Sequence, residues 1–108
     1  MAELEEPRAW IRVTPNAEPL FVELGGQLDI ASLPTIEADL DGLLRRDPAR
    51  VVIDMHDVHF MDSSAVAMLI RLANHFGGVT LERVNPMVRR IVEVLGLSDH
   101  LSIGRGSA

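Results

Sequence analysis

The feature that most constrains this chain is an alternation of short β-rich runs with helical patterns. "WIRV" (10–13) and "LFVEL" (20–24) are rich in β-branched and apolar residues, and the turn-forming "TPNAEP" between them predicts a hairpin. Each further β-rich run, "VVIDM" (51–55) and "VTLERV" (79–84), follows a segment with helical spacing. Strands that are separated by helices favour parallel pairing through right-handed crossovers. The sequence therefore predicts a sheet that is covered by helices.

Three segments carry the helical pattern, and residues that start or stop helices bound each of them. The apolar stripes of the first two are Leu33, Ile36, Leu40, Leu43 and Leu44, then Val66, Leu69, Leu72, Ala73 and Phe76. Ser32 before Pro34 is a start signal for the first helix, since proline is tolerated in a first turn. Asn85 is the predicted cap of the third helix, with Pro86 at its first position and Gly96 as its stop.

The order of elements predicts an α/β fold: a single small domain with a mixed β-sheet, an antiparallel edge hairpin and helices. A last short strand is expected within "LSDHLSI" (97–103), and Gly25–Gly26 is expected to break the second strand. We assign residues 10–103 to the domain. Residues 1–9 are expected to be a flexible lead-in, and residues 104–108 a flexible tail.

Composition excludes several classes of function. The formal net charge of −6 argues against direct nucleic-acid binding, which relies on basic residues to neutralise phosphates. No apolar run approaches the roughly 18 residues of a membrane span, so no membrane insertion is expected. The acidic "MAELEEPRAW" does not have the pattern of a secretory signal, and with 0 Cys there is no disulfide framework. These observations indicate a cytoplasmic protein.

Candidate functional residues lie where strands are expected to end. Asp62, Ser63 and Ser64 come just after the third strand and start the second helix, while Asp29 holds the matching place before the first helix. Asn85 follows the next strand. Because the carboxyl ends of parallel strands form one edge of a sheet, we expect Asp29 and Asp62 to border the same surface as Ser63. Aspartate and serine are also preferred helix caps, which is the other interpretation of these residues.

Short motifs follow one another along the chain in a fixed order. They are "GQLD" (26–29), "FMDSSA" (60–65), "GG" (77–78), "NPMVRRI" (85–91) and "GL" (96–97). This ordered set, spread over roughly residues 10–103, resembles the STAS domain, specifically the bacterial anti-sigma-factor antagonists. Two positions depart from the usual pattern. Gln27 replaces the acid of "G-E-L-D", and Ala65 replaces the glycine that follows the serine pair, which is expected to add a methyl group where a partner approaches.

Because no catalytic constellation is evident and the candidate edge is built from helix caps, we predict a non-enzymatic binding domain, with no cofactor and no metal. The resemblance implies that Ser63 would be the phosphoacceptor of a partner serine kinase, which is the anti-sigma factor itself. The unphosphorylated protein would bind that kinase and release the sigma factor, and a phosphatase would reset the phosphorylated form. The partner-binding rim would comprise Asp29, Asp62, Ser64 and Ala65.

The expected helix start gives a geometric reason to favour Ser63 over Ser64 as the acceptor. We expect Ser63 at or before the cap, with its side chain pointing out of the helix mouth, and Ser64 within the first turn. A phosphoserine adds about −1.5 to −2 charge at pH 7. A helix N-terminus tolerates that charge, because its dipole and its N–H groups favour anions. Phosphorylation is therefore expected to act on a partner and not on the fold.

Three other interpretations remain open at this stage. A serine hydrolase would need a base beside Ser63, and the histidines are His56, His59, His75 and His100, but no G-x-S-x-G motif is present. "HDVHFMD" (56–62) offers ligands for a metal, although a polar loop above the third strand is the simpler interpretation. Finally, some STAS domains are constitutive subunits or scaffolds of lipid-transport ABC systems or stress-sensing complexes, without the phosphorylation cycle.

Overall fold

The computed structural model describes residues 8–14, 17–47, 50–96 and 101–104. The elements in chain order are β1 (Trp10–Thr14), β2 (Leu20–Leu28), a 3-10 turn η2 (Leu33–Ile36), α1 (Glu37–Leu44), β3 (Arg50–Met61), α2 (Ser63–His75), β4 (Gly78–Glu82), α3 (Pro86–Val94) and β5 (Leu101–Ile103). This is the predicted order, including the short last strand. The predicted lead-in and tail fall mostly on residues outside the described ranges.

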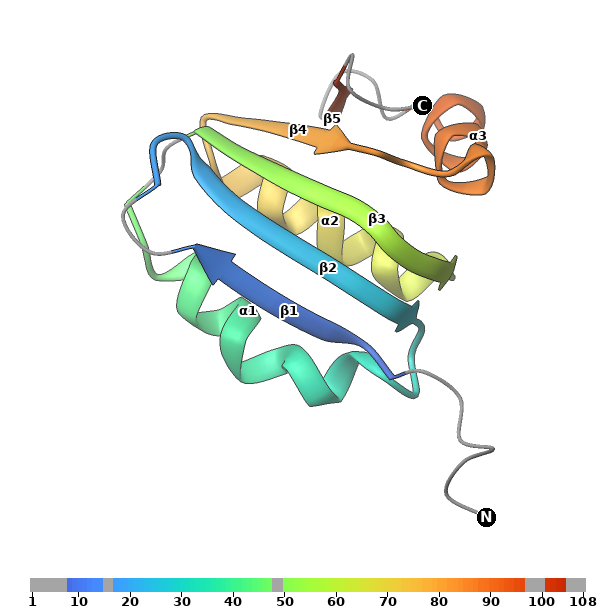
Figure 1. Cartoon of the computed structure of the whole chain (residues 1–108), viewed down its shortest axis with the longest axis horizontal. Coiled ribbons are helices and arrows are strands. Elements are labelled where there is room, and N and C mark those ends of the chain that lie inside the picture. The colour runs from blue at the N-terminus through green and yellow to red at the C-terminus, as the bar shows by residue number, and fades with distance from the viewer. Residues whose placement is uncertain (1–7, 15–16, 48–49, 97–100, 105–108) are drawn as a thin grey trace.

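The five strands form one mixed sheet in the order β1-β2-β3-β4-β5. β1 pairs antiparallel with β2, and the other three pairings are parallel. Helices α1 and α2 lie on the same face of this sheet, and α3 follows the end of β4 (Figure 1). The predicted α/β fold with an antiparallel edge hairpin is confirmed. None of the helices in the described ranges is long and apolar enough to span a bilayer.

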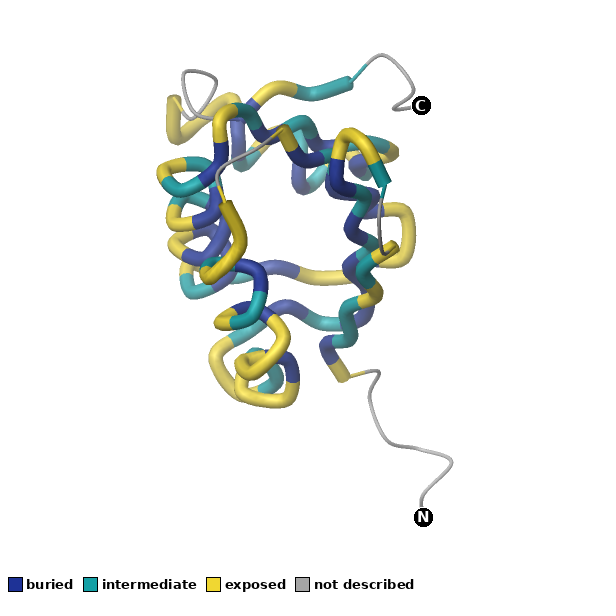
Figure 2. The backbone as a smooth tube through the Cα atoms, turned by 90° about the vertical axis from the view of Figure 1, so that its left-hand side faces the viewer, coloured by how far each residue is buried: buried dark blue, intermediate teal, exposed yellow. Residues whose placement is uncertain are grey.

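The core lies between the sheet and the helices. The largest side chains with less than 2% exposure come from every strand but the first and from α2 and α3: Leu24, Leu28, Ile53, Met55, Leu69, Leu72, Leu81, Leu101, Val22, Val88 and Val92. Figure 2 shows buried segments in both layers. The predicted stripe on α2 is buried at Val66, Leu69, Leu72 and Phe76, and Ala73 is half-buried.

The prediction that Gly25 and Gly26 break the second strand is wrong, because β2 continues through both residues to Leu28. Glycine is required there by close contacts. A Cβ at residue 25 would overlap the indole of Trp10, and one at residue 26 would overlap the carbonyl oxygen of Arg8. Gly26 also has a φ of +83°, which side chains disfavour. The register shifts on either side of the two glycines place extra residues on β3, so β3 bulges against β2 here and β2 continues without ending.

The segment 56–61 is also strand, and not the polar loop that its composition suggests. β3 runs for 12 residues to Met61 and pairs with the second half of β2 as far as Leu28 opposite Met61. His56, Asp57, His59 and Phe60 are exposed along this stretch, while Val58 and Met61 are buried. The irregular burial pattern follows from the register shifts, which interrupt the simple alternation of faces. As a consequence, β2 and β3 end at the same level.

Candidate functional site

Asp62 is the residue that starts α2. It has an extended backbone, and its Oδ1 atom accepts from the N–H groups of Ser64 (2.9 Å) and Ala65 (3.3 Å). The expectation that Ser63 lies at or before the cap is therefore wrong, since Ser63 occupies the first helical position. Aspartate accepts these N–H groups as a carboxylate, which caps a helix as well as serine does and adds a favourable charge to the dipole.

The second carboxylate oxygen of Asp62 joins α2 to the connection that follows β2. Oδ2 accepts from the N–H of Ile30 (3.0 Å), and the N–H of Asp62 donates to the carbonyl of Leu28 (3.1 Å). One side chain thus holds a helix start with one oxygen and the neighbouring loop with the other. We call this arrangement the Asp62 clamp. It fixes the two connections at the carboxyl ends of β2 and β3 to each other.

Asp29 shapes the same loop from the other side. Its Oδ1 accepts from the N–H of Ser32 (2.8 Å), and its carbonyl accepts from Ser32 (3.1 Å) and Leu33 (2.9 Å). Ser32 precedes η2 as predicted, but its own side chain makes no cap bond. The predicted placement of Asp29 and Asp62 on one edge is confirmed, because Leu28 and Met61 are register partners at the ends of adjacent strands.

The serine pair differs in exposure, and Ala65 is buried. Ser63 is exposed, and Ser64 is half-buried. Ala65 is 0% exposed, so the expectation that its methyl group adds to the partner surface is wrong. The methyl group points into the core, because the third residue of α2 already faces the sheet. Whether Asp29, Asp62 and Ser64 contact a partner stays a prediction.

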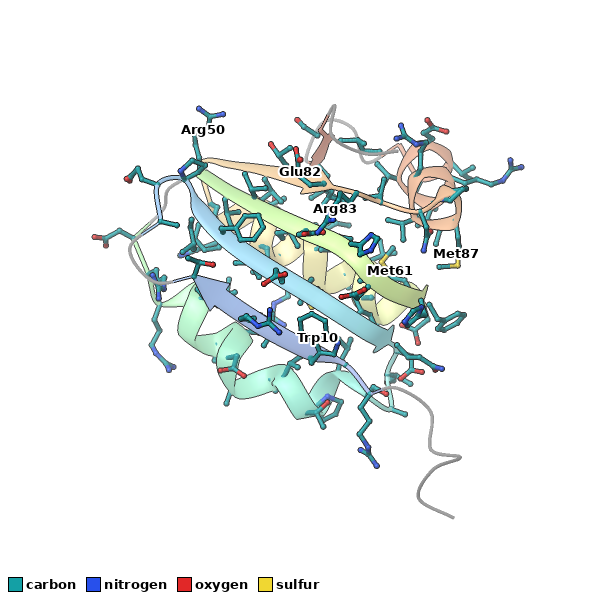
Figure 3. All side chains as sticks on the ribbon, viewed as in Figure 1. Trp10, Arg50, Met61, Glu82, Arg83 and Met87 are labelled. Carbon is teal, nitrogen blue, oxygen red and sulfur yellow. The ribbon has the colours of Figure 1, made fainter. Side chains whose placement is uncertain are left out.

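The third predicted connection reaches the same edge. Asn85 caps α3, with Oδ1 accepting from the N–H of Val88 (2.8 Å), and its Nδ2 donates to the carbonyl of Val58 on β3 (3.0 Å). Figure 3 shows Met61, the last residue of β3, and Met87, in the first turn of α3, at the same end of the sheet. The start of α3 is therefore tied to β3 close to the start of α2.

The histidines do not form a catalytic arrangement with Ser63 in the described part of the chain. His75 ends α2, about 18 Å along the helix from Ser63 at 1.5 Å per residue, and its Nε2 lies 2.8 Å from the carbonyl oxygen of Arg46. His56 and His59 are exposed on β3. Among the described residues, no group of three or more His, Asp or Glu side chains is placed to hold a metal. His100 lies outside the described residues.

From the sequence alone, Asp54 is not identified as a buried polar residue with a partner. Asp54, in the middle of "VVIDM", is 5% exposed and receives Arg83 Nη2 at 2.5 Å, Arg83 Nε at 3.2 Å and the N–H of His56 at 2.9 Å. Burial alone raises the pKa of Asp54, but the Arg83 hydrogen bonds, the His56 N–H and the Arg83 charge outweigh it, so the pKa lies below 3.8. A charged residue inside an apolar strand was the available signal that a partner must exist.

Comparison with known proteins defines the class of this domain. The STAS domain family matches residues 10–107, and the chain belongs to that family. A STAS-domain containing protein of Pseudomonas aeruginosa (strain UCBPP-PA14) is 37% identical over 78% of this chain and 88% of its own length. The anti-sigma F factor antagonist of Paenibacillus polymyxa is 31% identical over 72% of this chain and 71% of its own length. The resemblance drawn from the motifs is thereby confirmed.

Solved structures show the same fold at lower identity. SpoIIAA in its unphosphorylated form, an anti-sigma factor antagonist, superposes with a TM-score of 0.66 at 20% identity, covering 88% of each chain. The phosphorylated form of the same Bacillus cell fate determinant gives a TM-score of 0.64 at 17% identity, covering 88% of this chain and 91% of that chain. These structures establish the architecture into which the Asp62 clamp is built.

Proposed function

We propose that this chain is an anti-sigma-factor antagonist controlled by phosphorylation of Ser63. The unphosphorylated form binds an anti-sigma factor that is also a serine kinase, and this binding releases the sigma factor. Phosphate on Ser63 switches binding off, and a phosphatase restores it. The observation that carries the proposal is the exposed Ser63 at the first position of α2. The name of the Paenibacillus relative, anti-sigma F factor antagonist, supports it.

Ser63 is the better acceptor of the two serines. It is exposed, whereas Ser64 is half-buried and its backbone N–H is held by Asp62 Oδ1. A kinase must bring its own catalytic residues and the γ-phosphate of ATP to the hydroxyl, which requires a side chain that reaches solvent. The Asp62 clamp keeps the start of α2 in place while the kinase acts.

The switch works through charge. The chain carries −6, and one phosphate brings the total to about −8. The added charge lies beside Asp62 and on the same edge as Asp29, whose carboxylates accept only backbone N–H groups in the contacts described above. Like-charge contact costs several kcal/mol at an interface. The helix N-terminus favours the phosphate itself, so the fold is retained while the partner is rejected.

The protein acts in this scheme as a non-enzymatic binding domain of the cytoplasm, with no cofactor. A nucleophilic serine needs an adjacent base. The acid next to Ser63 is Asp62, and both of its carboxylate oxygens accept backbone N–H groups. Isolated protein is therefore expected to show no hydrolysis of nucleotides or esters that depends on Ser63.

The experiment that tests the proposal has two stages. The tagged chain is first purified from its native cells, and mass spectrometry identifies any serine-kinase anti-sigma factor that accompanies it and the phosphorylation state of the Ser63 peptide. The purified kinase is then incubated with ATP and with the parent chain, Ser63→Ala or Ser64→Ala. Phosphate is expected on the parent and on Ser64→Ala, and absent from Ser63→Ala. Phosphate that maps to Ser64 contradicts the proposal.

A further inference from the structure

Two large apolar side chains are exposed on the segments that meet at Asp62, the residue before Ser63. Ile30 is 74% exposed and Phe60 is 44% exposed. Phe60 precedes Asp62 by two residues at the end of β3, and the N–H of Ile30 donates to Asp62 Oδ2. A single exposed apolar residue is ordinary on a protein surface. Two of them lie on the segments that meet at the same aspartate, next to the proposed phosphoacceptor, and we call them the Ile30–Phe60 pair.

The Ile30–Phe60 pair is held by backbone contacts on both sides. Ile30 is fixed by Asp62 Oδ2, and the preceding Asp29 accepts from the N–H groups of Ser32 and Leu33. Phe60 lies on β3 opposite Gln27 of β2. Both side chains therefore project from ordered backbone. An anchor that is already in place loses little conformational entropy when a partner binds, which makes it an effective contact.

We infer that Ile30 and Phe60 are the apolar anchors that dock the anti-sigma factor around Ser63. The inference rests on the proposed function, and it gives the chemistry of the partner surface: an apolar depression that receives the pair. Interfaces are organised in this way, with a few buried apolar anchors at the centre and charged groups around them. Continuity with the Ser63 surface is the reason to choose this partner.

The same arrangement explains why phosphate has a large effect. A phosphate on Ser63 lies next to the apolar contact and is partly desolvated when the partner docks. Removing an ion from water without a compensating cation is costly. This desolvation cost adds to the like-charge repulsion at the edge of the sheet.

The remaining exposed apolar residues supply a matched control. Among the described residues, the other two large ones are Val94 and Leu95, with 69% and 56% exposure. Val94 ends α3, about 12 Å along the helix from Pro86 at 1.5 Å per residue. It is β-branched like Ile30 and almost as exposed, but it lies away from the α3 N-terminus that Asn85 ties to β3.

The test measures dissociation constants by calorimetry, without ATP, for the purified anti-sigma factor identified by the co-purification above. The variants are Ile30→Ser, Phe60→Ser and Val94→Ser, and each melting temperature is recorded. Ile30→Ser and Phe60→Ser are each expected to weaken binding by about tenfold or more, the size of an anchor contact. Val94→Ser is expected to stay within about twofold of the parent. If Phe60→Ser has a lower melting temperature than the parent, the result at the more exposed Ile30 position decides.

The outcomes separate the two proposals. One outcome is that the parent binds the anti-sigma factor, Ser63→Asp does not bind it, and Ile30→Ser binds it as tightly as the parent. That outcome refutes the role of the anchors, while the proposed function stands. Equal weakening by Val94→Ser also refutes the inference, because the contact would then not be specific to the Ile30–Phe60 pair. If the parent does not bind the purified anti-sigma factor, both proposals fall together.

Discussion

The acidic residues within the sheet and those at the edge where its parallel strands end have different hydrogen-bond partners. Within the sheet, Glu23 pairs with Arg12 (3.0 Å) and Asp54 pairs with Arg83 (2.5 Å), so each of these two carboxylates has a guanidinium beside it. At the edge, the carboxylates of Asp29 and Asp62 accept backbone N–H groups. An N–H group satisfies a lone pair without cancelling the charge. The carboxylates of Asp29 and Asp62 therefore keep their negative charge, while those of Glu23 and Asp54 each have a cation beside them.

This difference indicates where on the protein a phosphate can act as a signal. Next to a guanidinium, an added phosphate would gain an ion pair and would reorganise the surface. At the edge, the groups that hold the carboxylates are fixed backbone amides, and new charge changes the field without changing the structure. Substitution of Asp62 or of Asp54 removes the groups on which this difference depends.

The largest loss of stability is expected for Asp62→Ala. The variant loses the cap of α2, about 1–2 kcal/mol, and leaves the N–H of Ile30 without its acceptor, about 1 kcal/mol more. The free energy of unfolding, measured by urea titration, is expected to fall by about 2–3 kcal/mol. A loss below about 0.5 kcal/mol would contradict the clamp, since an ordinary surface substitution costs no more than that.

The next largest effect is expected for Asp54→Asn, which removes the charge of the Arg83 pair and keeps the shape of the side chain. The Arg83 side chain is 50% exposed, so water screens the lost interaction. We expect a loss of about 1–2 kcal/mol at pH 7. Arg12→Gln, at an exposed pair with 67% exposure of the arginine, is the matched control and should change stability far less.

The effect of Asp54→Asn is expected to depend on pH. Because the pKa of folded Asp54 lies below 3.8, the folded state releases its proton more readily than the unfolded chain does. The stabilisation is therefore fully present above pH 3.8 and is lost as pH falls through the folded pKa. The difference between parent and variant should stay constant from about pH 5 to 7 and shrink below about pH 4. If the stability difference between parent and Asp54→Asn grew as the pH fell, the pKa of folded Asp54 would be raised and not lowered, which would contradict its pairing with Arg83.

A smaller effect is expected for Asp62→Asn, which separates the two roles of the clamp. Asparagine caps helices as well as aspartate does, but it has only one oxygen, so Ile30 loses its acceptor. The free energy of unfolding should be about 1 kcal/mol lower than that of the parent. Hydrogen exchange should accelerate at the Ile30 amide and remain slow at Ser64 and Ala65. Equal acceleration at all three amides would show that the two contacts are not separable.

The smallest effect on stability is expected at Ser63 itself. Since Asp62 is the cap, Ser63→Ala removes no cap bond and should change the free energy of unfolding by no more than about 0.5 kcal/mol. Ser63→Asp should be neutral or slightly stabilising, because an acid in the first turn favours the helix dipole. Thermal unfolding of both variants checks this. A loss above about 1 kcal/mol in Ser63→Ala would mean that the serine caps the helix after all.

The fold was predictable because local and global signals agree in most of the chain. Asn85 and Pro86 mark the start of α3 from sequence alone, and the apolar stripe of α2 points at the sheet as its spacing requires. The convergence of Asp29 and Asp62 followed from parallel pairing, in which strand ends share an edge. These inferences needed only periodicity, caps and the handedness of crossovers.

The errors came from contacts between residues far apart in the sequence. Gly25 breaks a strand by local rules, and only the indole of Trp10 on the neighbouring strand shows why a glycine belongs inside β2. The extension of β3 to Met61 likewise depends on pairing with β2, and the bulges of β3 against that strand hide the alternation in its sequence. The cap was misplaced for a simpler reason: with Asp62 and Ser63 adjacent, both are good caps, and packing of Ala65 into the core chooses between them.

The most direct test of the account is the affinity of the purified anti-sigma factor for two forms of this protein: unphosphorylated, and phosphorylated at Ser63 to a stoichiometry verified by mass spectrometry. The account predicts that phosphate weakens binding by at least about a hundredfold, or roughly 3 kcal/mol, while the circular dichroism spectrum and melting temperature stay unchanged. Equal affinity of the two forms, or a loss of binding that accompanies unfolding, would contradict it.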